Sequence, residues 1–219
     1  MTLRRAFQSN FVPALFLWGF AALILALYWN HAPTQSALND LAQLKTRLGL
    51  WFVMPAQAFA AAVLPFCFQK FQSGTHRKTR LSHLPYLMLF FAFLGAATDL
   101  FYRFQAQIFG NSAQFSIIAP KVALDMLFYT PVLILPLIVW VFAFKDCNFQ
   151  IAATRQYVGK NWVRERVLPI YLVNLLVWTP AVCVIYALPL ALQFPIQAIV
   201  ACLWSLILVV LTDTATEEK

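Results

Sequence analysis

Six apolar runs, each long enough to cross a lipid bilayer, constrain the fold of this chain more than any other feature. They cover residues 11–29, 50–68, 84–104, 122–144, 167–188 and 194–212. Each is close to the roughly 20 residues of α-helix that span a hydrocarbon core. Because backbone groups in lipid must be satisfied within the protein, these runs predict an all-α, multi-pass transmembrane bundle of six hydrophobic helices.

The basic residues between the runs predict the orientation of the chain. Six crossings return the C-terminus to the side on which the N-terminus lies. If that side is the cytoplasm, 12 of the 16 Lys and Arg residues fall inside, and the four outside are Lys45, Arg47, Arg103 and Lys121. Basic loops resist translocation, so we expect both termini on the inner side, the N-in/C-in orientation.

Composition also favours a membrane. The chain is 62% hydrophobic and 11% charged, whereas a soluble domain carries roughly 25% charged residues. Its net charge of +8 comes largely from short basic clusters beside the runs. Such clusters favour the anionic lipids of an inner leaflet rather than nucleic acid. We therefore expect a lipid bilayer as the partner and no nucleic acid.

The runs suggest two parts. Residues 1–49 are expected to form an N-terminal transmembrane anchor helix with an outer loop, and residues 50–219 a membrane domain of five helices. The first run is longer than the roughly 7 to 15 apolar residues of a secretory signal peptide, and no small-residue cleavage site follows it, so we interpret it as a retained anchor.

A mixed segment, residues 148–166, connects the fourth and fifth runs. Apolar Ile151, Val158 and Trp162 alternate there with charged side chains, namely Arg155, Lys160, Arg164 and Glu165. This pattern is typical of an amphipathic helix that lies in the headgroup zone with its basic residues towards phosphate. A solvated linker with scattered apolar residues is the alternative.

Prolines inside the runs predict irregular helices. Pro55, Pro65, Pro131, Pro136 and Pro180 each lack a backbone donor and disturb the carbonyl four residues upstream. At membrane depth that carbonyl needs another partner, so we expect kinks around a wet or tightly packed interior. A role in packing alone is the alternative.

Two aspartates inside the runs are the strongest functional signal. Of eight acidic residues only Asp99 and Asp125 lie within runs, where a carboxylate costs about 2.5 to 3.5 kcal/mol. Arg103 follows Asp99 by four residues and Lys121 precedes Asp125 by four, so each base shares a helix face with its acid. Because the third and fourth helices run antiparallel, the spacing predicts one cluster of four charges in the outer leaflet.

Three interpretations of this cluster differ in function. It could be an ion-paired staple between two helices, or a charged constriction that lines a pore and selects ions or solutes. Paired aspartates are also found in intramembrane aspartyl proteases, but here each acid has a base one turn away, and Asp125 lacks the Gly-x-Gly-Asp setting of those enzymes.

Other polar residues give weaker signals. Gln57 and Asn174 lie inside runs, where amides usually bond between helices. His31, His76 and His83 lack the spacing of metal ligands. The sequence has no nucleophile elbow and no phosphate-binding glycine loop. We therefore expect no catalytic residues, no metal and no cofactor, and a protein that is not an enzyme.

Motifs around the two aspartates resemble a known family. Lys121-Val-Ala-Leu-Asp125-Met126, followed by Pro131, resembles the Lys-x-x-x-Asp-Gln-x-x-x-x-Pro signature of the Mpv-seventeen or twenty-two-kilodalton peroxisomal membrane protein family. The segment from Gly95 to Tyr102 falls where that family has Gly-Pro-x-x-His-x-Trp-Tyr, with Asp99 in place of the His. Further along the chain the family has a Trp-Pro pair, an aromatic-x-Val-Pro motif and a late Trp. The residues that resemble these positions are Trp178, Pro180, Tyr186, Pro189 and Trp204.

The resemblance covers residues 95–211 and implies a location and an activity. The family implies an integral protein of a mitochondrial, peroxisomal or bacterial inner membrane, and several members are proposed to form weakly selective solute channels. It makes Asp99, Lys121 and Asp125 motif positions, whereas Arg103 rests on spacing alone. Met126 replaces the Gln of the signature, and an inserted Thr179 separates Trp178 from its proline.

We therefore expect a weakly selective channel or passive transporter for ions or small solutes, acting as a homo-oligomer. The alternative is a non-conducting scaffold that supports assembly or organises lipids. Conduction predicts that Gln57, Asp99, Asp125 and Asn174 converge on one hydrated path. A scaffold predicts that the charges close on one another in a dry interior.

Overall fold

The computed structural model describes the backbone of residues 3–71 and 80–217 and the side chains of residues 11–70 and 80–206, and this part of the chain is all-helical. Of the basic residues that set the expected orientation, Arg4, Arg5, Arg77, Lys78 and Lys219 have side chains outside these ranges. The longest helices are α1 (Leu3–Asn30), α2 (Ala32–Leu48), α5 (Leu84–Phe109), α9 (Leu168–Tyr186) and α10 (Leu190–Glu217). The remaining elements are α3 (Leu50–Ala58), η1 (Phe59–Val63), α4 (Leu64–Phe71), η2 (Leu81–His83), α6 (Phe115–Leu124), η3 (Asp125–Ile134), α7 (Leu135–Asp146), α8 (Ile151–Val158) and η4 (Val163–Val167).

Five segments of the described chain are long and apolar enough to cross a membrane. They are Phe11–Asn30, Leu50–Lys70, Leu81–Phe109, Phe115–Asp146 and Val163–Tyr186. The sixth expected run lies in α10, whose apolar part among the described side chains, Leu190–Leu206, is shorter than the other five. Most of the residues in each span are not buried inside the bundle, which leaves their apolar side chains to face lipid.

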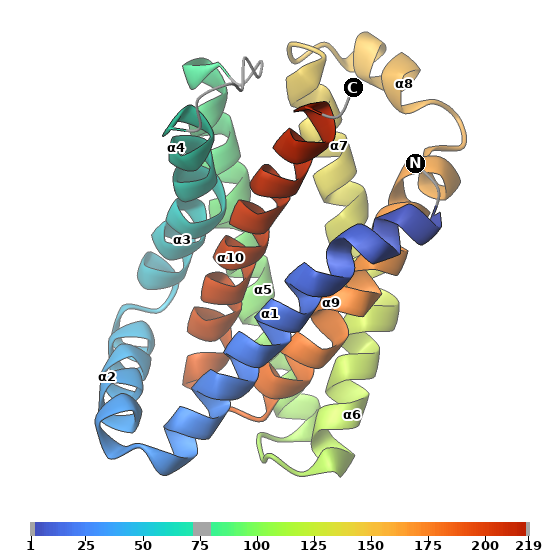
Figure 1. Ribbon diagram of the computed structural model, residues 1–219. Coiled ribbons are helices and arrows are strands. Elements are labelled where there is room, and N and C mark those ends of the chain that lie inside the picture. The colour runs from blue at the N-terminus through green and yellow to red at the C-terminus, as the bar shows by residue number, and fades with distance from the viewer. Residues whose placement is uncertain (1–2, 72–79, 218–219) are drawn as a thin grey trace.

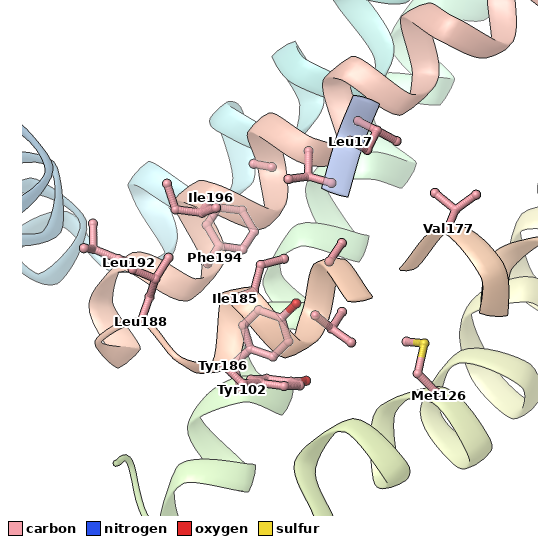
Figure 2. Packing of buried hydrophobic residues seen from close by; sticks show 14 of the residues in the cluster. Leu17, Tyr102, Met126, Val177, Ile185, Tyr186, Leu188, Leu192, Phe194 and Ile196 are labelled. Carbon is pink, nitrogen blue, oxygen red and sulfur yellow. The ribbon is translucent and has the colours of Figure 1, made fainter. Parts of the chain in front are cut away.

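The helices form one bundle with α10 near its centre. α10 packs against α1, α2, α4, α5 and α9. The start of α1 and the end of α10 lie at the same end of the bundle, and α8 lies across that end (Figure 1). Apolar side chains of α9 and α10, including Ile185, Leu192 and Phe194, form the core together with Leu17 of α1 (Figure 2).

The segment expected as an outer loop is helix α2. His31 precedes the helix, and its ring nitrogen Nδ1 accepts a hydrogen bond from the backbone N–H of Thr34. Pro33 occupies the first turn, where the missing donor costs nothing. α2 packs against α1 and α10, and Trp18 of α1 donates a 2.9 Å hydrogen bond to the carbonyl of Val177 in α9. The N-terminal part is therefore packed into the bundle.

Prolines coincide with wide, π-helical turns. The carbonyls four residues upstream of Pro65, Pro131 and Pro169 belong to Ala61, Leu127 and Glu165, which lie in η1, η3 and η4 respectively. A π-helical turn opens the backbone where the proline ring would collide with that carbonyl. Pro55 and Pro180, in contrast, lie within the α-helices α3 and α9.

Candidate functional site

Asp99 lies at the centre of a buried ion-paired site. Its side chain on α5 is 1% exposed, and two cations approach its two oxygens from different helices. Lys45 Nζ, from α2, lies 2.5 Å from Oδ1. Arg103, one turn further along α5, places Nε and a terminal guanidinium nitrogen each 2.8 Å from Oδ2. The negative charge of the carboxylate is thereby compensated by two cations.

Lys45 is a site residue that lies in helix α2, although its segment was expected to form an outer loop. Its side chain is 4% exposed in the structure. A signal for this position exists in the sequence, because Leu38, Ala42 and Lys45 follow the i, i+4, i+7 spacing of one helix face. Leu38 and Ala42 both pack against the core, so the face that carries Lys45 points into the bundle.

Asp125 is held by neutral hydroxyl groups. It is buried at the start of η3. The Tyr186 hydroxyl, from α9, donates a 2.6 Å hydrogen bond to Oδ2. The Thr130 hydroxyl, from the next turn of η3, donates a 3.1 Å hydrogen bond to Oδ1. The Tyr186 hydrogen bond therefore joins η3 to α9, and the Thr130 hydrogen bond lies within η3.

Lys121 is a buried amine without an acidic partner. Only 1% of the residue is exposed, and among the described side chains no carboxylate lies within 4.0 Å of its amine. Its Nζ lies 5.8 Å from the centroid of the Tyr186 ring. Its backbone carbonyl accepts a 3.0 Å hydrogen bond from Gln105 of α5.

The four expected charges therefore do not form one cluster. The pairing of Asp99 with Arg103 along α5 is confirmed. In the described part of the chain, Asp99 does not pair with Lys121, and Asp125 pairs with neither Arg103 nor Lys121. The physical reason is that α2 brings Lys45 to Asp99, while Tyr186 occupies the hydrogen-bonding position beside Asp125.

The two in-membrane amides make no hydrogen bond to either aspartate among the described side chains. Gln57 is buried, and its Oε1 has no hydrogen-bond partner. Its Cβ packs against Gly95 so closely that a Cβ on Gly95 would lie 2.6 Å away. The Asn174 Oδ1, on α9, is also buried without a partner. Gln57 therefore marks the close contact of α3 with α5.

Residues at the positions of the family motif have packing roles. The Tyr102 ring meets the Tyr186 ring edge-on, 5.3 Å between centroids (Figure 2). Trp178 and Trp204 pack against the apolar core. Pro131 lies within η3 and Pro180 within α9. Pro189 lies in the turn between α9 and α10, where its carbonyl accepts a hydrogen bond from Leu192.

A cavity of about 670 Å³ is lined by residues of α6, η3 and α9. Met126, Leu175 and Cys183 are among its mainly apolar lining residues. None of the residues Asp99, Arg103, Lys121 and Asp125 lines it. The charged residues and this cavity are therefore separate features of the bundle. Among the described residues, no group of three or more His, Cys, Asp or Glu side chains is arranged to hold a metal ion.

The fold and the spans define an all-helical integral membrane protein. No protein-family model matches the chain, and no curated protein and no solved structure is significantly similar to it.

Proposed function

We propose that this membrane protein acts as a non-conducting scaffold, which supports assembly or organises lipid through a fixed arrangement of helices. We propose further that it crosses the membrane six times with α10 as the last span. A common side for both termini is supported by the start of α1 and the end of α10, which lie at one end of the bundle together with α8 (Figure 1). The assignment of that side as the inner one, the N-in/C-in orientation, rests on the 12 of 16 Lys and Arg residues that fall there.

The closed Asp99 site carries this proposal. A charged group that selects ions in a pore must be accessible to the ions that pass it. Asp99 is 1% exposed, and Lys45 and Arg103 occupy both of its oxygens. Asp125 is likewise closed by Tyr186 and Thr130. Both carboxylates are thus engaged in holding helices together, which is the arrangement expected of a scaffold.

A second candidate, a channel or passive transporter, is favoured by Lys121. A buried amine without a carboxylate is costly in a membrane and marks a functional position by default. Asp125 lies one helical turn away, so loss of the Tyr186 hydrogen bond would let the amine and the carboxylate approach each other. Such an exchange of partners could accompany opening, alone or in a homo-oligomer.

Current recordings from planar bilayers that contain the purified protein separate the two candidates. The set comprises the parent chain and the variants Asp125→Asn and Lys121→Gln, each with insertion verified and an ionophore added at the end as a positive control. A scaffold gives silent bilayers for all three. Discrete openings in the parent, with ion selectivity that changes in the variants, would instead establish the channel.

The resemblance to the Mpv-seventeen family stays a proposal beside this one. It rests on Gly95, Asp99, Lys121, Asp125 and the proline and aromatic positions that follow. Residence in a bacterial inner membrane or in a mitochondrial or peroxisomal membrane follows from that resemblance alone. Fractionation of the host cell, with detection of the chain in each membrane, tests it directly.

A further inference from the structure

The connection between α7 and α9 carries three exposed cations that have no acidic partner. These exposed cations are Arg155, which lies in the last turn of α8, and Lys160 and Arg164, which follow the helix. In the described part of the chain no carboxylate pairs with any of them. Other cations nearby are engaged. Arg166 donates to the Tyr157 carbonyl and stacks on the Tyr157 ring, and Lys145 pairs with Asp146.

Large apolar side chains are exposed beside these cations. Ile151 is 62% exposed and Val163 is 54% exposed, and Tyr157 is exposed as well. Exposed apolar side chains that form a patch are unfavourable in water and mark a protein or membrane interaction surface. Cationic and apolar residues side by side are typical of a surface that sits at the boundary between headgroups and acyl chains.

The connection is also anchored to the bundle, unlike a solvated linker. Phe149 adopts a left-handed backbone conformation with φ of 62°, which a bulky residue rarely adopts. Its ring is held by the rings of His83, Tyr86 and Phe144, with centroids 5.0 to 5.7 Å away. Trp162 meets Trp140 of α7 edge-on, 5.9 Å between centroids.

These anchors fix α8 across the end of the bundle, where the start of α1 and the end of α10 also lie (Figure 1). Thr154 and Val158 are the inward side of α8 and are buried. The helix therefore presents its remaining side chains away from the bundle in a fixed arrangement.

We infer that this region is a binding surface for the phosphate headgroups of anionic phospholipids. The surface, here called the α8 surface, consists of Arg155, Lys160 and Arg164 with Ile151, Tyr157 and Val163. Guanidinium and ammonium groups form charge-assisted hydrogen bonds with phosphate oxygens, and anionic headgroups supply the charge that three unpaired cations need. The apolar members favour a lipid surface over a soluble anion. This inference is independent of whether the bundle conducts.

Lipid binding to the full-length protein in a neutral detergent tests the inference. Phosphatidylglycerol or phosphatidylcholine is titrated into delipidated protein, and bound lipids are counted by native mass spectrometry. We expect the parent to prefer phosphatidylglycerol by about tenfold. The variant Arg155→Gln/Lys160→Gln/Arg164→Gln should lose most of that preference, whereas Arg155→Lys/Arg164→Lys, which keeps the charge, should retain most of it.

Two controls keep the outcome interpretable. Arg47→Gln removes one exposed cation from α2 and should leave the preference unchanged. Each of the three single Gln variants should lose part of the preference, which covers the case in which the triple variant does not fold. Equal binding of the two lipids by the parent, or an unchanged preference in the triple variant, would overturn the inference. Displacement of the lipid by inorganic phosphate at matched concentration would do so as well, since it would indicate a site for a free anion.

Discussion

Asp99 and Asp125 occupy equivalent places in the bundle but are stabilised in different ways. Asp99 lies ten residues before the end of α5, and Asp125 lies ten residues after the start of α6. Asp99 is compensated by two cations, Lys45 and Arg103. Asp125 receives hydrogen bonds from two neutral hydroxyls, while the nearest base along its helix, Lys121, pairs with neither aspartate.

The comparison of the two aspartates shows that proximity in the sequence does not decide which base compensates a buried acid. Removing one partner of a buried ion pair leaves the other charge desolvated and costs about 3 to 5 kcal/mol, whereas a hydrogen bond to a charged group contributes about 1.5 to 3 kcal/mol. The Asp99 site should therefore tie α2 to α5 strongly, and the Asp125 site should tie η3 to α9 more weakly.

The largest expected effect is that of Asp99→Asn. The variant leaves the buried Lys45 ammonium without its carboxylate, so we expect a loss of about 3 to 5 kcal/mol in the free energy of unfolding. Unfolding by SDS in mixed micelles measures it. Asp125→Asn is the matched control, because its amide oxygen can still accept the Tyr186 hydrogen bond and the loss should be about 1 kcal/mol. Equal losses in the two variants would remove the distinction between the sites.

The next largest difference in stability is expected between substitutions of the two buried lysines, Lys45 and Lys121. Lys45→Met leaves Asp99 with Arg103 alone, and we expect a loss of about 3 kcal/mol, the lower end of the range for a broken buried pair. Lys121→Met removes an amine that pairs with no carboxylate among the described side chains, so stability should be retained or increased. The same SDS titration compares them. A larger loss for Lys121→Met would mean that its amine contributes to the Asp125 site.

Tyr186→Phe tests the hydroxyl that binds Asp125, which among the described side chains has no cation beside it of the kind that Asp99 has. It removes the 2.6 Å hydrogen bond to the carboxylate, and a hydrogen bond to a charged group contributes about 1.5 to 3 kcal/mol. Tyr102→Phe is the control, since the Tyr102 ring packs against Tyr186 but its hydroxyl makes no hydrogen bond to Asp125 in the described structure. Unfolding of the two variants under identical conditions gives the difference, and similar losses would assign the effect to ring packing.

The sequence was sufficient to predict the all-helical membrane fold, because long apolar runs have few alternatives in lipid. It was also sufficient for the Asp99 and Arg103 pair, which depends on spacing along one helix. The role of Lys45 at the Asp99 site was not predicted, because α2 contains few apolar residues and was expected to be a loop. Leu38 and Ala42 nevertheless lie on the same face of α2 as Lys45. The role of Tyr186 could not be predicted, since its position beside Asp125 depends on how α9 packs against η3.

Among the substitutions that remove a partner of either aspartate, Arg103→Gln should have the smallest effect, although Arg103 makes a hydrogen bond and an ion-pair contact to Asp99. Its side chain is 43% exposed, and partly exposed ion pairs contribute at most about 1 kcal/mol. Lys45 remains to neutralise the carboxylate, so Asp99 stays compensated after the substitution. The double variant Lys45→Met/Arg103→Gln is informative, because it removes both cations and should cost more than the sum of the single variants. Additive losses in SDS unfolding would mean that the two cations act independently on Asp99 and do not compensate for one another.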